Sequence, residues 1–194
     1  MGRPSLAEQR TREILDAFER CVARHGLEAS SLELVAEEAG MKRSILRHYV
    51  GNRGQLIVAL AERVIQKYQA FFEDHLAASS RLAPIGQLMG YFFPKVSASS
   101  PESILVIESL IAEGSRNEVV RRQMQDYVDW LVTRCAELLR IEYPGATKKK
   151  CWDVSYGLVC LCFNQESLTP LQLPRKYAKA AKLSAEILIA SLDG

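Results

Sequence analysis

The 194-residue sequence is poor in the features that mark membrane and secreted proteins. No segment approaches the run of about 20 apolar residues that is needed to cross a bilayer. The first ten residues, MGRPSLAEQR, have no apolar core and do not resemble a secretory signal. The formal net charge is only +2, which does not by itself indicate a nucleic-acid partner. We therefore expect a globular, cytoplasmic protein.

The sequence also lacks the cysteine and histidine patterns that hold metals. The five cysteines are odd in number, and no CxxC or Cys/His pair has zinc spacing. Cys160 and Cys162 are two residues apart, so on a helix they point to different faces. Small buried thiols in a reducing compartment are the favoured interpretation, and a thiol- or metal-sensing role is the alternative. We expect no metal and no cofactor.

Catalytic motifs are absent as well. The sequence contains no GxSxG, P-loop, HExxH or dinucleotide fingerprint. Its acidic residues, such as Glu37 and Glu38, are expected on exposed helix faces, where solvated charge is the usual state. Nothing in the sequence indicates an enzyme.

What the sequence does have is helical periodicity from end to end, without repeats and without the alternation of strands. Glycine and proline divide the pattern. The predicted helices outside the basic region described below cover about residues 6–24, 53–77, 84–93, 101–113, 117–142, 147–165 and 174–192. Residues 94–102 and the segment between the last two helices are expected to be loops.

One segment, SLELVAEEAGMKRSILRHYVGNR from Ser31 to Arg53, has the pattern of a helix-turn-helix. Ser30 and Ser31 are both suitable N-caps, and Ser30 with Glu33 has the spacing of a capping box. Gly40 can adopt the left-handed conformation that ends the first helix. In the second helix Leu46 and Val50 are expected to face inward. Between residues 39 and 61 there are four cations and no carboxylate, which favours insertion into a DNA major groove.

The residues around this segment resemble the DNA-binding region of the tetracycline-repressor (TetR) family. The shared pattern covers about residues 11–60, roughly a quarter of the chain. It consists of Ile14, Leu15, Ala17, Phe18, Gly26, Ser31, Val35, Ala36, Ala39, Gly40, Leu46, Tyr49, Asn52, Arg53 and Leu56. Three positions differ from the family: Lys42 replaces a capping Ser or Thr, Arg47 replaces Tyr, and Val50 replaces Phe.

The resemblance implies an all-α protein with a three-helix DNA-binding unit at residues 1–53 and a larger effector-binding and dimerisation domain at 54–194. It assigns base contacts to Arg43, Ser44 and Ile45, and phosphate contacts to Ser31, Arg47, Tyr49 and Arg53. Lys42 and His48 complete the predicted DNA-binding set, and Arg3 and Arg10 are candidates for additional contacts.

The same resemblance implies a small-molecule pocket, although aromatics at helical spacing are more often core. We predict its wall at Phe72, Met89, Phe93, Ile107, Glu108, Leu110, Ile111, Tyr127, Trp130, Trp152 and Tyr156, with Glu108 favouring a cationic or amphipathic effector. The last two helices are expected to pair with a second subunit. The expected function is that of a homodimeric repressor that leaves a palindromic double-stranded DNA operator when a small-molecule effector binds. The alternatives are the thiol- or metal-sensing regulator and a helical protein-interaction module that never meets DNA.

Overall fold

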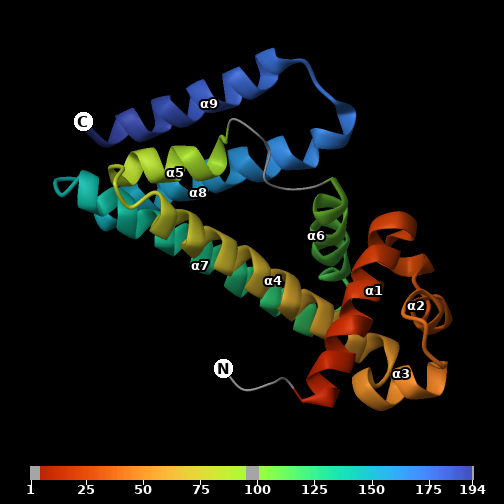
Figure 1. Cartoon of the computed structure of the whole chain (residues 1–194). Coiled ribbons are helices and arrows are strands. Elements are labelled where there is room, and N and C mark those ends of the chain that lie inside the picture. Colours follow the sequence, from red (N-terminus) through yellow and green to blue (C-terminus); the bar gives the residue numbers. More distant parts are fainter. Residues whose placement is uncertain (1–4, 95–100, 194) are drawn as a thin grey trace. The chain divides into compact units, whose positions relative to one another are not determined.

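The computed structural model describes residues 5–94 and 101–193, and in this part of the chain every regular element is a helix (Figure 1). The described residues form two compact units. The first consists of residues 5–66 and 102–124, and the second of residues 67–94, 101 and 125–193. Helix α4 (Arg53–Ala78) and helix α7 (Glu118–Glu142) each contribute to both units. The predicted all-α fold is confirmed.

The first unit begins with α1 (Leu6–Ala29), which has a complete capping box. Ser5 Oγ accepts a hydrogen bond from the Glu8 amide at 3.2 Å, and the Glu8 carboxylate accepts one from the Ser5 amide at 2.8 Å. Gly26 lies at φ 77° and ψ 163°, so it breaks the helical path where the sequence predicts a stop. The buried face of α1 consists of Ile14, Leu15, Ala17, Phe18, Cys21, Val22 and Leu27.

The helix-turn-helix follows as α2 (Leu32–Glu38) and α3 (Arg43–Val50), both of which pack against α1. Gly40 has a φ of 63°, which confirms the predicted left-handed turn. Leu46 is fully buried and Val50 nearly so, as the spacing predicts. Helix α3 therefore has one side fixed in the core of the unit.

The cap of α2 differs from the prediction. Ser31 is the N-cap, and its hydroxyl accepts a hydrogen bond from the Leu34 amide at 3.2 Å. Ser30 instead donates its hydroxyl to the Gly26 carbonyl at 2.8 Å and closes the end of α1. The capping box that we predicted between Ser30 and Glu33 is therefore wrong, because α2 begins at Leu32 with Ser31, one residue later, as its N-cap.

The start of α4, most of α6 (Pro101–Glu113) and the start of α7 complete the first unit. Arg63 on α4 forms an ion pair with Asp16 on α1 and donates to the Arg12 carbonyl at 3.0 Å. Gln123 on α7 donates to the Val58 carbonyl at 3.4 Å. These contacts hold α1, α4 and α7 together within the unit.

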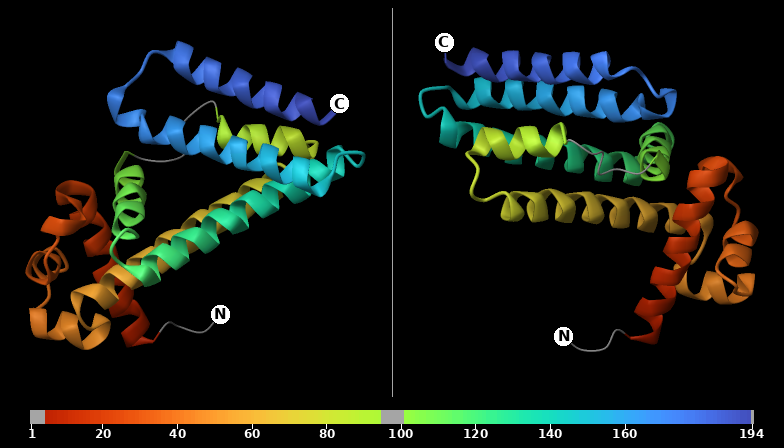
Figure 2. Two further views of the ribbon diagram at one scale, coloured as in Figure 1. Left: turned by 180° about the vertical axis from the view of Figure 1, so that it is seen from behind. Right: turned by 45° about the horizontal axis from the view of Figure 1, so that its top comes forward.

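The second unit contains the end of α4, α5 (Pro84–Phe92), most of α7, α8 (Lys148–Ser167) and α9 (Arg175–Ala190). Helices α8 and α9 lie side by side, and both views of Figure 2 show them as a pair. The rings of Phe72, Tyr91 and Trp130 form the centre of an aromatic cluster. Phe72 contacts Tyr91 at 4.7 Å and Trp130 at 5.7 Å between ring centroids. Edge-to-face pairs of this kind add to the stability gained from burial.

The helix boundaries agree with the predicted ranges to within about two residues, apart from the segment of α1 beyond Gly26. Two 3-10 turns, Thr169–Leu171 and Ser191–Asp193, were not predicted. The predicted loop at 94–102 lies mostly outside the described residues, which include only its positions 94, 101 and 102. The predicted domain boundary after residue 53 falls at the start of α4 and stays a prediction. None of the described helices combines the length and the apolar character that a membrane crossing requires.

Candidate functional site

The exposed edge of α3 is opposite its buried side. Lys42, the N-cap, makes no side-chain capping bond, in agreement with its departure from the family pattern. The side chains on both sides of buried Leu46 are exposed, three before it in addition to Lys42 and two after it. The exposed residues are Lys42, Arg43, Ser44, Ile45, Arg47 and His48. Ile45 is 44% exposed, which is unusual for an isoleucine unless it has a partner. This edge combines cations, a hydroxyl and one apolar side chain, the mixture that reads base edges in a major groove.

Arg43 has an intramolecular partner. Its guanidinium lies 2.7 Å from the Glu33 carboxylate on α2, and both side chains are more than half exposed. An exposed ion pair of this kind contributes only about 0.2–1 kcal/mol. Arg43 is therefore held near the start of α3 but can exchange Glu33 for another partner at little cost.

The remaining predicted contact residues of this unit lie on α3 and on the helices before and after it. The rings of His48 and Tyr49 meet edge to face at 5.2 Å. Arg53 donates to the Leu27 carbonyl at 2.6 Å and lies 3.9 Å from the Glu28 carboxylate, so it also has a role in holding α4 to the end of α1. Ser31 is half-buried at the start of α2. Arg10 is paired with Glu13 at 2.7 Å, and Arg3 lies outside the described residues.

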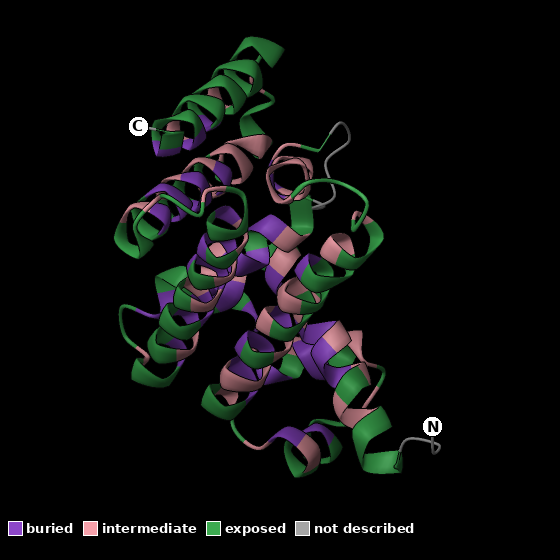
Figure 3. Ribbon diagram, turned by 90° about the vertical axis from the view of Figure 1, so that its left-hand side faces the viewer, coloured by how far each residue is buried: buried purple, intermediate pink, exposed green. Residues whose placement is uncertain are grey.

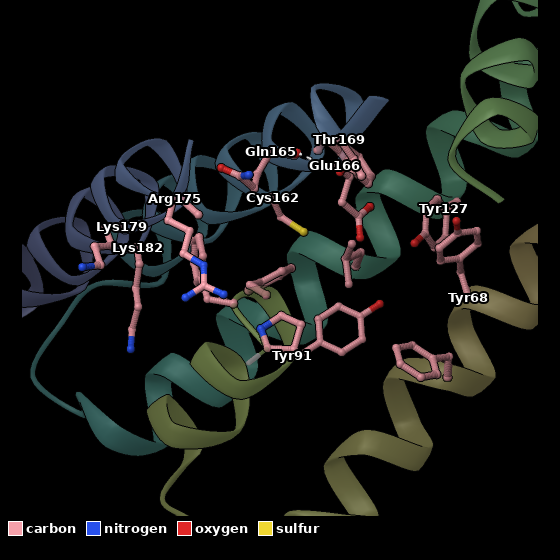
Figure 4. A pocket seen from close by; sticks show the side chains of 17 residues that line it. Tyr68, Tyr91, Tyr127, Cys162, Gln165, Glu166, Thr169, Arg175, Lys179 and Lys182 are labelled. Carbon is pink, nitrogen blue, oxygen red and sulfur yellow. Dashed lines mark hydrogen bonds between the residues drawn. The ribbon is translucent and has the colours of Figure 1, made fainter. Parts of the chain in front are cut away.

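The second unit contains a cavity of about 650 Å³ that is partly open to solvent. Its wall comes from α4, α5, α7, α8, the turn after α8, and α9. The lining residues are Tyr68, Phe71, Tyr91, Phe92, Phe93, Pro94, Tyr127, Leu131, Cys162, Phe163, Gln165, Glu166, Thr169, Arg175, Ala178, Lys179 and Lys182. Figure 4 shows the basic side chains of α9 at one end and Tyr68 and Tyr127 at the other, with Cys162 and Tyr91 between them. A cavity of this size and aromatic content suits a drug-sized ligand.

Of the predicted effector wall, Phe93 and Tyr127 line this cavity. Phe72 is fully buried and Trp130 half-buried in the aromatic cluster, and Met89 is half-buried on α5. Four predicted residues on α6, namely Ile107, Glu108, Leu110 and Ile111, belong to the first unit. Trp152 and Tyr156 are exposed on α8, where their rings stack at 5.7 Å. The predicted set is therefore distributed over both units, and as an effector site it stays a prediction.

Sequence reasoning missed the contribution of α9 to the cavity. Arg175, Lys179 and Lys182 are spaced i, i+4 and i+7, so they share one face of that helix. This spacing was visible in the sequence. The sequence does not show which helices the basic face of α9 lies against, because that depends on the tertiary fold.

The buried tyrosines and thiols of this unit remain protonated at neutral pH. Burial raises the pKa of Tyr91 and of Tyr127 well above that of a free phenol, so both are neutral hydrogen-bonding groups. Burial likewise raises the pKa of the Cys162 thiol and of the Cys135 thiol. Because the thiolate is the reactive form, these two cysteines are poor redox sensors. No group of three or more potential metal ligands was found in the described parts of the chain.

The helix-turn-helix, with its exposed basic edge, has the form of a DNA-binding unit. Residues 14–60 match the family model described as "Bacterial regulatory proteins, tetR family". The chain is 22% identical over 194 residues to the HTH-type transcriptional regulator BetI of Rhizobium meliloti (strain 1021), covering 98% of this chain and 89% of that protein.

Solved structures share the fold. A TetR transcription regulator from Haloarcula marismortui superposes with a TM-score of 0.78 at 13% identity, covering 95% of this chain and 98% of that one. A regulator from Saccharomonospora viridis, solved in complex with choline, gives a TM-score of 0.75 at 16% identity, covering 94% of this chain and 96% of that one. The chain is therefore similar to TetR-type transcriptional regulators, in sequence over residues 14–60 and in fold over most of its length.

Proposed function

We propose that the protein is a homodimeric repressor that binds a palindromic operator and leaves it when a small molecule enters the cavity of the second unit. The observation that carries the DNA part is the exposed edge of α3. Its opposite side is fixed by Leu46 and Val50, so the edge is presented on a rigid support. Such a regulator would act in the cytoplasm, where a prokaryotic chromosome lies.

On α3 the proposed base contacts come from Arg43, Ser44 and Ile45, and the proposed phosphate contacts from Arg47 and its neighbours. Side chains in the first turn of a recognition helix reach base edges, whereas those one turn later on the flank meet the backbone. The planar guanidinium of Arg43 suits the O6 and N7 acceptors of guanine, and the Ile45 side chain suits a thymine methyl group. Lys42, His48, Tyr49, Arg53 and Ser31 would add contacts around this centre.

The proposal of a dimer rests on an apolar face of α8 and α9. On α9 Leu183 and Ile187 are 57% and 63% exposed, and on α8 Trp152 and Tyr156 are also exposed. Figure 3 shows α9 largely in the colour of exposed residues. Large exposed apolar side chains that cluster in this way mark an interaction surface. A twofold pairing of this surface would use the same residues on both subunits.

Leu183→Glu tests the dimer, with Leu82→Glu as the matched control. Both leucines lie in the second unit and are exposed to a similar extent, 57% and 53%, but Leu82 follows α4 and is not on the α8–α9 face. We expect Leu183→Glu to give a monomer in analytical ultracentrifugation, because charge would be buried without a partner, and Leu82→Glu to leave the dimer intact. A wild-type protein that is monomeric at micromolar concentration would refute the proposal.

The DNA part is tested by selecting duplexes from a random pool with the purified protein. Two recognition helices related by a twofold axis require an inverted repeat, with half-sites about 34–36 Å apart or a multiple of that. Affinity for the selected duplex should fall steeply with salt, since phosphate contacts release counterions. Selection of sequences without an inverted repeat contradicts the twofold arrangement. An affinity for DNA that does not depend on salt favours the interaction-module alternative.

The effector part rests on the cavity together with the continuity of α4. The last part of α4 supplies Tyr68 and Phe71 to the cavity wall, and the helix begins directly after α3. A ligand that changes the packing around Tyr68 can act through this helix on the recognition helix. Ligand and operator must then weaken each other by the same factor, typically through about 1–3 kcal/mol of coupling. The neighbour from S. viridis holds choline, which shows that the fold can bind a small molecule.

Two tryptophan substitutions distinguish the described cavity from the predicted wall on α6. Ala178→Trp adds an indole to the cavity from α9, whereas Ile111→Trp changes an exposed position of the first unit. We expect Ala178→Trp to abolish effector-induced release of DNA while operator affinity stays within about threefold, and Ile111→Trp to have little effect. The reverse result would move the effector site to α6.

A further inference from the structure

The cavity carries its cations at one end. Arg175, Lys179 and Lys182 all line it from the same face of α9, and Figure 4 shows their side chains on the same side of the cavity. Lys182 is 3.9 Å from Glu186 on its own helix. Among the described residues, no carboxylate pairs with Arg175 or with Lys179. Two cations at the cavity wall are therefore available to a ligand.

The charge of the wall is positive. Glu166 is the sole carboxylate among the described residues that line the cavity, against three cations. The phenols of Tyr91 and Tyr127 do not change this balance, because burial keeps both protonated. Like charges at the wall repel a ligand cation that approaches past α9, whereas they attract an anion and raise its rate of entry.

The rest of the wall is aromatic. Phe71, Phe93 and Phe163 offer ring faces and edges from α4, the end of α5, and α8. Beyond the basic end, the hydroxyl groups of Tyr68 and Tyr127 form a second polar region (Figure 4). The apolar surface between the two regions can bury the body of a ligand whose charged group stays at α9.

We propose that the effector is an amphipathic anion, with a carboxylate or similar acidic group held by Arg175 and Lys179 and an aromatic or other apolar body packed against the phenylalanines. This inference rests on the proposed effector function of the cavity and names its ligand class. It differs from our prediction of a cationic or amphipathic effector beside Glu108, because Glu108 belongs to the first unit and does not line the cavity.

The test compares three probes that share one ring system and differ in charge: naphthoate, naphthylmethanol and naphthylmethyl-trimethylammonium. Binding to the full-length protein is measured by titration calorimetry. We expect naphthoate to bind at least about tenfold more tightly than the other two, the factor that one charge-assisted contact typically supplies. Equal or tighter binding of the ammonium probe overturns the proposal in favour of a cation held by Glu166 and the tyrosines. The absence of naphthoate binding also overturns it.

A pair of double variants localises the effect. Arg175→Gln/Lys179→Gln removes the two proposed contacts, and Lys148→Gln/Lys176→Gln removes two charges of the same unit that do not line the cavity. The first variant should lose the preference for naphthoate over naphthylmethanol, and the control should keep it. Circular dichroism checks that both variants are folded. Retention of the preference in the first variant contradicts the assignment.

DNA release is measured separately, with the duplex selected from the random pool. If naphthoate binds with the expected preference but leaves the DNA complex intact at saturation, the ligand class stands and the proposed regulatory function fails. If another probe class binds preferentially and releases DNA, the regulatory function stands and the ligand class is wrong.

Discussion

Replacing Arg43 with alanine tests the proposed division between base recognition and phosphate binding on α3. Loss of a good bidentate contact to guanine costs about 1–3 kcal/mol. In the free protein Arg43 already has a partner in Glu33, at 2.7 Å, and giving up that exposed pair costs only about 0.2–1 kcal/mol. The pair therefore reduces the net gain from DNA without cancelling it. With the middle of each range the net loss is about 1.4 kcal/mol, so we expect the affinity of Arg43→Ala for the selected duplex to fall roughly tenfold.

The assay is fluorescence anisotropy with two kinds of duplex, the selected sequence and a random one, each titrated over a range of salt concentrations. Arg43→Ala should lose affinity mainly for the selected duplex and relax one base position in a repeated selection. Arg47→Ala, the matched control one turn later, should weaken both duplexes similarly and lower the salt slope by about one unit. Glu33→Gln should strengthen both by up to a few-fold, because it frees Arg43 and removes a carboxylate near the phosphates.

Stability supplies the control for folding. Both arginines are exposed, so Arg47→Ala should change the free energy of unfolding by no more than about 0.5 kcal/mol, and Arg43→Ala, which also loses the ion pair with Glu33, by no more than about 1 kcal/mol. Identical specificity profiles for Arg43→Ala and Arg47→Ala would refute the division of roles. So would a loss of affinity for random DNA in Arg43→Ala as large as the loss for the selected duplex.

Three further predictions concern stability and reactivity. Gly40→Ala should lower the free energy of unfolding by about 1 kcal/mol or more in urea titrations, because its φ of 63° disfavours a side chain. The control, Gly86→Ala inside α5, should be neutral or slightly stabilising, and equal effects would argue against the left-handed turn. Phe72→Ala should cost about 3–5 kcal/mol, since the side chain is fully buried in the aromatic cluster, and a loss below about 1 kcal/mol would mean that the cluster is loosely packed. Iodoacetamide at pH 8.5, roughly the ordinary pKa of a thiol, should alkylate exposed Cys160 and leave buried Cys162 unmodified, because the raised pKa of Cys162 keeps its thiol neutral. Fast labelling of Cys162 in mass spectrometry would support the thiol-sensing alternative.

The helices and the exposed edge of α3 could be predicted because they depend on local sequence. The spacing of Leu46 and Val50 determines which side of α3 is buried, and the opposite edge follows from helical geometry. The cap of α2 could not be predicted with the same certainty. Ser30 and Ser31 are equivalent by type, and the path of the chain after Gly26 decides which of them caps the helix.

The cavity could be predicted only in part, because its wall is assembled from five helices and a turn. Periodicity indicates that Phe93 and Tyr127 lie on apolar faces, but Trp152 and Tyr156 follow the same rule and are exposed in the single chain. The facing of α9 is also a tertiary property. From the sequence alone, the basic residues of α9 are expected to be ordinary solvated charges. Only the packing of α9 against α8 shows that three of them line the cavity.

The division of α4 between the two units has a consequence for unfolding. The backbone hydrogen bonds of α4 continue from one unit into the other. If the segment in one unit unfolds, the adjoining turns in the other unit lose hydrogen bonds and packing contacts. The two units should therefore melt as one cooperative transition and not as independent domains. In native-state hydrogen exchange, amides at residues 62–70 should then open only with the global free energy of unfolding, although several of their side chains are exposed.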